Sequence, residues 1–230
     1  CVWSTINLSN SVSGGAWSSG AAGVATVSSS GVVTGISAGS ATISYTVAGS
    51  CGSSSAIAVV VVNPAPNAGT ITGGGSVCVG STLNLGNAVS GGAWSSSAAG
   101  VASVSAAGVM TGVSAGTALI SYTVSNSCGT ASATTSIVVN PMPNAGTITG
   151  GGTVCVGATI NLSDAVSGGT WSSGATGTAT VNAARVVTGI AAGSANISYT
   201  VSNSCGTSNA TTTVAVNPLP NAGVINGASS

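Results

Sequence analysis

Residues 94–128 read WSSSAAGVASVSAAGVMTGVSAGTALISYTVSNSC and by themselves indicate the fold class. Short runs of β-branched and apolar residues alternate with turns of Gly, Ser and Ala, and no run has the period of a helix. Ile120, Tyr122 and Val124 share one face of a strand, because successive side chains of a strand point to opposite faces. The stretch therefore predicts short β-strands, with a turn at 106–108.

The same pattern extends through the surrounding segment, residues 67–140. Seven short strands separated by Gly and Ser turns are expected, which is typical of a β-sandwich. The expected strands lie within 67–73, 81–89, 93–96, 101–105, 109–113, 117–128 and 133–140.

This segment is one of three copies with a period of 77 residues. The motifs SGG(A/T)WSS and SYTV, the prolines of NPAPN, NPMPN and NPLPN, and the six cysteines all keep the period. A repeat of this length is a small domain rather than one coil of a solenoid, and alternating prolines make a stiff, extended connector. The expected boundaries are 1–63 for the first domain, 64–140 for the second, 141–217 for the third and 218–230 for a terminal strand.

The near absence of charge excludes several classes of function. The 230 residues include one Lys or Arg, one Asp or Glu and no His. Acid–base catalysis, zinc and calcium sites, and phosphate binding all need such residues in number. We therefore expect no enzyme activity, no cofactor or metal and no nucleic-acid partner. No apolar run approaches the roughly 18 residues of a membrane helix, and the absence of a signal peptide before Cys1 indicates a mature form.

The run 94–124 and its copies from Trp17 and Trp171 resemble bacterial immunoglobulin-like repeats of the group 2 (Big) type. The pattern of that family is W-S-S, V-A-x-V, G-x-V-T-G and A-G-x-A-x-I, and it covers nearly all of each repeat. The resemblance implies an all-β chain of three tandem immunoglobulin-like β-sandwiches on an extracellular stalk, adhesin or appendage. The lack of charge departs from the family, so calcium binding by related adhesin repeats is not carried over.

We predict one disulfide within each repeat. In an immunoglobulin-type sandwich, the strand after the first cysteine and the strand before the second run antiparallel on facing sheets, so the start of one meets the end of the other. Each bond would close a loop of about 50 residues and contribute about 4 kcal/mol. Structural disulfides are typical of an oxidising, extracellular setting. The predicted pairs are Cys1–Cys51, Cys78–Cys128 and Cys155–Cys205.

The frame of the repeats is offset from the chain. The first-strand segment that precedes Cys78 and Cys155 has no counterpart before Cys1, yet a copy of it follows the third repeat as PLPNAGVINGASS. An uncovered sheet edge and an unpaired strand are both unfavourable in water, and three domains in line would hold these two about 100 Å apart. We therefore predict donor-strand complementation between copies. The predicted donor strand is Asn221, Ala222, Gly223, Val224, Ile225, Asn226 and Gly227.

Such a contact is heterologous, so its repetition builds an open head-to-tail filament. The alternative is a stalk segment of one long tandem-repeat adhesin. Two further hypotheses are less favoured: an adhesive module needs loops that differ between copies, and an ice-binding surface needs regular Thr-x-Thr ranks. The partners that the filament implies are other copies of the chain, and beyond them a cell-surface anchor or a glycan.

Aromatic residues that recur with the repeat are expected in the domain cores, since sandwiches of this type bury a Trp on the third strand. They are Trp17, Trp94, Trp171, Tyr45, Tyr122 and Tyr199. Trp3 replaces Gly80 and Gly157 of the other copies, and we expect it to plug the joint between subunits. Arg185 is expected in a hairpin turn and Asp164 on the surface, neither with a function.

Overall fold

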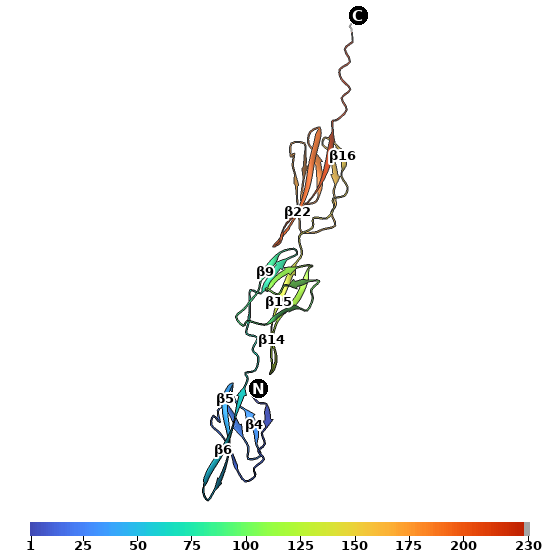
Figure 1. The fold of residues 1–230 in the computed structure, drawn as a ribbon. Coiled ribbons are helices and arrows are strands. Elements are labelled where there is room, and N and C mark those ends of the chain that lie inside the picture. The colour runs from blue at the N-terminus through green and yellow to red at the C-terminus, as the bar shows by residue number, and fades with distance from the viewer. Residues whose placement is uncertain (228–230) are drawn as a thin grey trace. The chain divides into compact units, whose positions relative to one another are not determined.

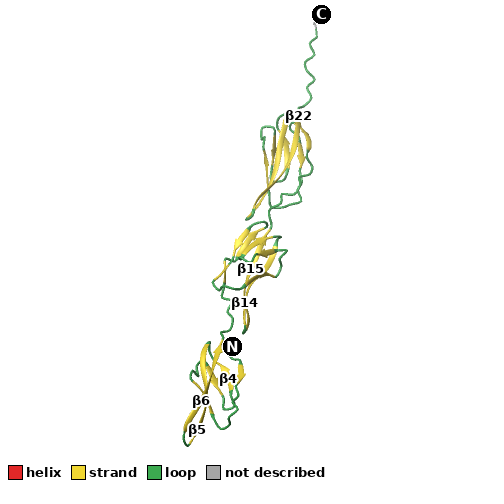
Figure 2. Ribbon diagram, viewed as in Figure 1, coloured by secondary structure: helices red, strands yellow, loops and turns green. Residues whose placement is uncertain are grey.

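The computed structural model describes residues 1–227. Within this range the regular secondary structure consists of β-strands, with no helix (Figure 2). The all-β prediction is therefore confirmed. The chain forms two compact units, Cys1–Val139 and Asn140–Ser230. The first unit contains the first and second repeats, and the second unit contains the third (Figure 1). None of the described residues belongs to a helix that could span a membrane.

The second repeat has the most complete set of strands. One sheet has four strands in the order β11-β14-β15-β8, a second has the order β12-β13-β9, and β10 pairs with β7. The strands are β7 (Ile71–Thr72), β8 (Gly75–Cys78), β9 (Thr82–Asn84), β10 (Gly86–Asn87), β11 (Ala93–Ser96), β12 (Ala102–Val104), β13 (Val109–Gly112), β14 (Gly116–Asn126) and β15 (Gly129–Asn140).

The third repeat follows the same plan, with sheets in the orders β16-β22-β21-β18 and β17-β20-β19. Its strands are β16 (Gly152–Cys155), β17 (Thr159–Asn161), β18 (Thr170–Ser173), β19 (Ala179–Val181), β20 (Val186–Gly189), β21 (Gly193–Asn203) and β22 (Gly206–Asn217).

The first repeat has only the sheets β2-β5-β6 and β1-β4-β3 among the described residues. Its strands are β1 (Thr5–Asn7), β2 (Ala16–Ser19), β3 (Ala25–Val27), β4 (Val32–Gly35), β5 (Gly39–Gly49) and β6 (Gly52–Val62).

Most predicted strands agree with the structure; the exceptions are 67–73, where only Ile71–Thr72 forms a strand, and 81–89. This segment is expected as one strand, but it divides at Leu85 into β9 and β10, which belong to different sheets. Leu85 itself is buried in the core. The short strand β8, which pairs with β15, is absent from the prediction.

Each repeat packs its two sheets around an apolar cluster of its own. In the second repeat, alternate residues of β14 and β15 point inward, and Ile120 and Ile137 are fully buried beside Met110. Burial of such side chains contributes about 1.5–3 kcal/mol each, and it is the main stabilising term in a chain with almost no charge.

In every repeat, the hydroxyl of a buried tyrosine forms two hydrogen bonds with the backbone of the loop that precedes the tryptophan strand. Tyr122 is 5% exposed, and its hydroxyl accepts a hydrogen bond from Gly92 N at 2.8 Å and donates one to Val89 O at 2.7 Å. The partly buried Trp94 stands opposite Tyr122 in the ladder, with ring centroids 4.8 Å apart. A Cβ at Gly92 would lie 2.4 Å from the Tyr122 ring, so only glycine fits there. The corresponding pairs are Trp17–Tyr45 and Trp171–Tyr199.

The disulfide pairing predicted from the sequence is wrong. Cys1 is bonded to Cys128 of the next repeat, with Cα atoms 5.4 Å apart, while Cys51 and Cys155 are free and exposed. Cys78 and Cys205, which stand 77 residues after Cys1 and Cys128, are disulfide-bonded as well. All three predicted pairs, Cys1–Cys51, Cys78–Cys128 and Cys155–Cys205, are therefore contradicted.

The reason is the length of the strands. Cys155 stands beside Asn217 at the end of β22, whereas Cys205 lies in the turn before the other end of that strand, at Gly206. At about 3.3 Å per residue, the two ends of β22 are about 36 Å apart. The two cysteines of one repeat therefore lie at opposite ends of the domain, and the disulfide joins neighbouring repeats instead.

Asp164, expected on the surface, is only 6% exposed. Its counterpart Asn87 makes two hydrogen bonds: Nδ2 donates to Ala68 O at 2.8 Å, and Oδ1 accepts from Val89 N at 2.9 Å. Asp164 keeps only the second, from Val166 N at 2.8 Å. Its Oδ2 has no hydrogen-bond partner among the described residues, because a carboxylate oxygen has no proton to donate to a carbonyl.

Asp164→Asn is therefore expected to stabilise the third repeat by about 1–3 kcal/mol, the usual cost of an unsatisfied buried polar group. The amide would regain the donor that Asn87 uses in the second repeat. Native-state hydrogen exchange of the β21 amides measures the change. Asn87→Asp is the matched control and should destabilise β14 by a similar amount; unchanged or faster exchange in Asp164→Asn would contradict the explanation.

Candidate functional site: an open groove in the first repeat

In the second repeat, residues 67–78 cover one side of the sandwich, and we call them the covering segment. Ala68 is 4% exposed and Val77 is 9% exposed, while Ile71 is half-buried against the core. In the third repeat the covering segment is 144–155, where Ala145 is 2% exposed. These small apolar side chains complete the core along β15 and β22.

Backbone contacts fix the register of the covering segment. In the second repeat, β7 pairs antiparallel with β10, so that Ile71 stands opposite Asn87. Gly73 has a φ of +86°, and a Cβ there would lie 2.3 Å from Asn84 O. Glycine is needed at this position because of both the left-handed conformation and the close approach.

The first repeat has no covering segment among the described residues. Its sheet β2-β5-β6 ends at β6, whereas β15 and β22 are each followed by one more strand. Val60 of β6 is half-buried, while its counterparts Ile137 and Val214 are 0% exposed. A core surface that the other two repeats bury is thus open to solvent.

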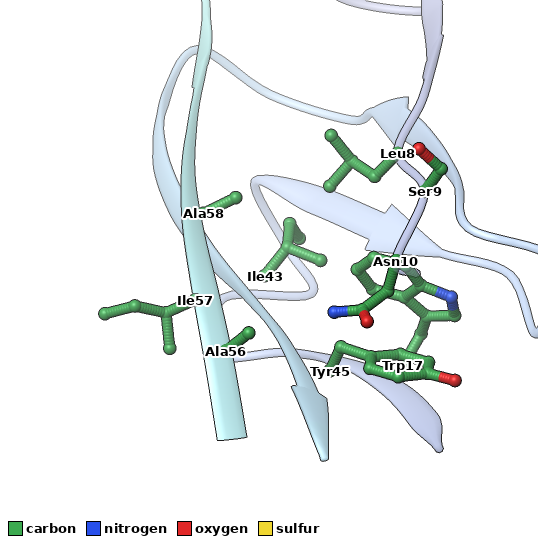
Figure 3. A pocket seen from close by; sticks show the side chains of 9 residues that line it. All are labelled: Leu8, Ser9, Asn10, Trp17, Ile43, Tyr45, Ala56, Ile57 and Ala58. Carbon is green, nitrogen blue, oxygen red and sulfur yellow. The ribbon is translucent and has the colours of Figure 1, made fainter. Parts of the chain in front are cut away.

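The uncovered surface forms a row of hollows along β6. One of them has a volume of about 140 Å³ and lies between residues 8–10 and β6. Figure 3 shows Ile43, Tyr45 and Asn10 at this hollow, with Ile57 pointing away from it. Further hollows lie beside Ser54 at one end of β6 and beside Val62 and Cys1 at the other. We call this row the open groove.

The open groove is lined by apolar residues and by uncharged polar residues, among them Ser4, Ser9 and Ser54. Its main polar group is Asn10, the counterpart of Asn87. Asn10 Oδ1 accepts a hydrogen bond from Val12 N at 2.9 Å, as Asn87 Oδ1 does from Val89 N. Asn10 Nδ2 lacks the carbonyl partner that Ala68 supplies to Asn87, as far as the described residues go. The groove therefore suits an uncharged, extended backbone with small apolar side chains.

The predicted donor strand, residues 221–227, has the local structure of a covering segment. Asn221 Oδ1 accepts a hydrogen bond from Gly223 N at 2.9 Å, as Asn67 Oδ1 does from Gly69 N. Gly223 has a φ of +69°, close to the +61° of Gly69. Ile225 is 96% exposed, although its counterpart Ile71 packs against a core. The donor strand therefore has the local conformation of a covering segment, but Ile225 packs against no core among the described residues.

Two differences between the repeats, one just after the predicted donor strand and one in β6, were not predicted from the sequence. A Cβ at Gly74 would lie 2.6 Å from Thr135 Oγ1, and one at Gly151 would lie 2.7 Å from Thr212 Oγ1. The counterpart of these glycines after the third repeat is alanine, at position 228 outside the described residues. The counterpart of the threonines in the first repeat is Ala58, which has no hydroxyl group.

Trp3 lies at the end of the groove that contains Cys1. It is 76% exposed, has a φ of +64° and donates a backbone hydrogen bond to Gly35 O at 2.8 Å. A residue other than glycine in this conformation costs about 1–2 kcal/mol, and Gly80 and Gly157 adopt it in the other repeats. A joint with another subunit remains a prediction for Trp3.

The outer face of β6 carries an apolar stripe that the sequence comparison also missed. Ile57, Val59 and Val61 are 70%, 67% and 61% exposed. The third repeat has Thr211, Thr213 and Ala215 at these positions, so the stripe belongs to the first repeat.

Comparisons with known proteins found solved structures of low similarity. No family model and no curated protein matches the chain. A surface-layer protein, SbsC domains 1–6, is similar at 19% identity over 90% of this chain, with a TM-score of 0.29. The chain spans 35% of that surface-layer chain.

Two further solved structures contain tandem domains. The I67–I69 fragment of titin is 13% identical, covers 91% of this chain and 84% of its own, and has a TM-score of 0.45. Mouse protocadherin-24 EC1-3 is 10% identical over 93% of this chain and 92% of its own, with a TM-score of 0.40. Because these similarities are distant, the immunoglobulin-like sandwich assignment rests on the strand orders given above.

A peptide should be able to fill the open groove. We expect the synthetic peptide NAGVINGASS, residues 221–230, to slow hydrogen exchange in β6 when it is added to a chain that ends at Asn217. The reason is that β6 gains a neighbour and its core face is covered. The same peptide with Ile225→Asp is the matched control. Equal protection by both peptides, or protection of β15 in place of β6, would contradict the assignment of the groove.

Proposed function

We propose that this chain is the structural subunit of an extracellular filament or surface appendage, in which the donor strand of one copy enters the open groove of the next. The observation that carries the proposal is that one chain has both an uncovered core and an uncovered strand of matching chemistry. The role is structural and not enzymatic. The partner is a second copy of the chain, with a cell-surface anchor or a glycan beyond the filament.

The second repeat supplies the register for this contact. By the pairing of β7 with β10, Ile225 would stand opposite Asn10, and Asn226 opposite Ser9. Ala222 O would accept the hydrogen bond from Asn10 Nδ2, as Ala68 O does from Asn87. Gly227 would approach Asn7 O, as Gly73 approaches Asn84 O.

The energetics favour insertion. Burial of Ile225 alone contributes about 1.5–3 kcal/mol, and hydrogen bonds along the strand add to it. The donor strand already has the turn at Gly223 that a covering segment needs, which lowers the entropy lost on binding. Copies of a chain with a formal net charge of zero also lack the long-range repulsion that keeps many proteins apart.

The contact leads to a filament because the strand and the groove are different surfaces. A heterologous contact leaves one free strand and one free groove after each addition, so growth continues unless a ring closes. The two disulfide-bonded cysteine pairs support an oxidising, extracellular setting. The group 2 (Big) motifs support the same setting for the repeats.

The second candidate is a stalk segment of a longer tandem-repeat adhesin. It is favoured by the connector PLPNAG, which matches PAPNAG and PMPNAG and could lead into a further repeat. In that case a preceding segment would cover the first repeat. The subunit is favoured by two sequence differences that compensate in size: alanine at 228 replaces Gly74 and Gly151, and Ala58 replaces the threonines that lie against these two glycines.

Ile225→Asp is expected to abolish filaments, since a buried carboxylate in the groove costs several kcal/mol. Negative-stain microscopy and light scattering of the purified chain measure this outcome. Val224→Asp is the matched control, because the counterparts of Val224, Thr70 and Thr147, are exposed; it should still form filaments.

Filaments that persist in Ile225→Asp would overturn the donor-strand contact. A denaturing gel of reduced, boiled filaments separates the two candidates. A band at the subunit mass of 21.1 kDa supports the filament subunit, and a far larger polypeptide supports the tandem adhesin.

A further inference from the structure

The disulfide between Cys1 and Cys128 belongs to a joint that has other contacts. Cys128 lies in the turn of the β14–β15 hairpin, and this hairpin tip meets the connector that leads from the first repeat to the second. Asn63 Nδ2 donates to Ser127 Oγ at 3.2 Å, and Asn126 Nδ2 donates to Pro64 O at 3.0 Å. The hairpin tip therefore rests on the connector at the point where the covering segment enters the second repeat.

The same contacts recur in the second unit. Asn203 Nδ2 donates to Pro141 O at 3.0 Å, and Cys205 Sγ lies 3.8 Å from Asn140 O. Cys205 is disulfide-bonded, as Cys128 is. A cysteine at the hairpin tip, seated on the connector that enters its own repeat, is thus a repeated feature of the chain.

The two free cysteines, Cys51 and Cys155, occupy the two sequence positions that form this disulfide elsewhere in the chain. Cys51 lies in the turn of the β5–β6 hairpin, between Gly49 and Gly52, and is the counterpart of Cys128 and Cys205. Cys155 is the counterpart of Cys1 and Cys78, and it stands beside Asn217, where the connector to the donor strand begins. Cys51 therefore lies at a hairpin tip without a connector beside it, and Cys155 lies beside a connector without a hairpin tip, among the described residues.

We propose that Cys155 of the copy that donates its strand forms a disulfide with Cys51 of the copy that receives it. This inference rests on the proposed function. When the donor strand fills the groove, its connector passes the β5–β6 hairpin tip as residues 63–64 pass the β14–β15 tip. Because Cys155 lies beside Asn217, it would then come close to the β5–β6 hairpin tip. The new bond between two chains would have the same arrangement as the Cys1–Cys128 bond within one chain.

The proposed joint between subunits differs from the joints within the chain at one residue of the hairpin tip. Gly49 replaces Asn126 and Asn203, so the first hairpin lacks the side-chain amide that donates to the connector at the other two hairpins. Ser50 is retained as the counterpart of Ser127. The joint between subunits would therefore have one side-chain hydrogen bond fewer than the joints within the chain, and its stability would depend more on the disulfide.

The oxidation balances with a small-molecule disulfide such as oxidised glutathione. One cysteine thiolate attacks the glutathione disulfide, which forms a mixed disulfide and releases one glutathione thiolate. The second cysteine thiolate then attacks the protein sulfur of the mixed disulfide, which forms the Cys51–Cys155 bond and releases the second glutathione. The two protons of the cysteine thiols end on the two glutathione thiols.

The test is a non-reducing denaturing gel of filaments grown with oxidised glutathione and then alkylated. The wild-type chain should give a ladder in steps of 21.1 kDa that collapses to the monomer on reduction. Cys51→Ser and Cys155→Ser should each form filaments by microscopy but run as monomers. A mixture of the two variants should stop at the dimer, because each chain then contributes one thiol. Mass spectrometry of the dimer should identify the peptide pair joined through Cys51 and Cys155.

The outcomes separate this inference from the proposed function. Filaments without a wild-type ladder would overturn the disulfide and leave the strand contact intact. Neither filaments nor a ladder would overturn both. A ladder in the Ile225→Asp chain that equals the wild type, or dimers of Cys51→Ser alone, would mean that the thiols combine without strand exchange, and this would also overturn the inference.

Discussion

The edge of a β-sheet has to be covered, and the architecture of this chain depends on how that constraint is met. In the second and third repeats, a short strand beside β15 or β22 completes the sheet and closes the core. In the first repeat β6 is left as an edge with its inward side chains only partly buried. An unpaired edge attracts another strand, so the same requirement that stabilises a repeat would also supply the contact that we propose between copies.

The near absence of charge changes what the rest of the molecule must do. Without ion pairs, specificity comes from shape and from buried hydrogen bonds, and the Tyr122 hydroxyl and the Asn87 amide each hold a loop in place by two such bonds. Gly92 and Gly73 permit approaches that any Cβ would block. Asp164 shows the cost of departing from this plan, because a carboxylate accepts hydrogen bonds without returning one.

Much of the fold follows from local patterns in the sequence. Alternation identifies the strands, glycine and proline mark the turns, and the period of 77 residues identifies the repeats. The disulfides could not be predicted in this way: parity places Cys128 on one face of its strand but does not say at which end of the domain it lies. The open groove lies where the described residues of the first repeat have no counterpart of the covering segment. The fit that we propose between the groove and the donor strand involves Ala58 and the alanine at 228. These two residues are far apart in the sequence, and their relation emerges only when the contacts of Gly74 are known.

Arg185 is the only lysine or arginine in the chain, and it occupies a tight turn between β19 and β20 with a φ of +69°. Its backbone N–H donates to Asn182 O, and its carbonyl accepts from Leu162 N, both at 2.9 Å. Proteases bind their substrates as extended segments, and this turn cannot extend without breaking both bonds. Enzymes that cut after basic residues therefore find a single site in the chain, held in a conformation that they cannot bind, which favours persistence in a protease-rich environment.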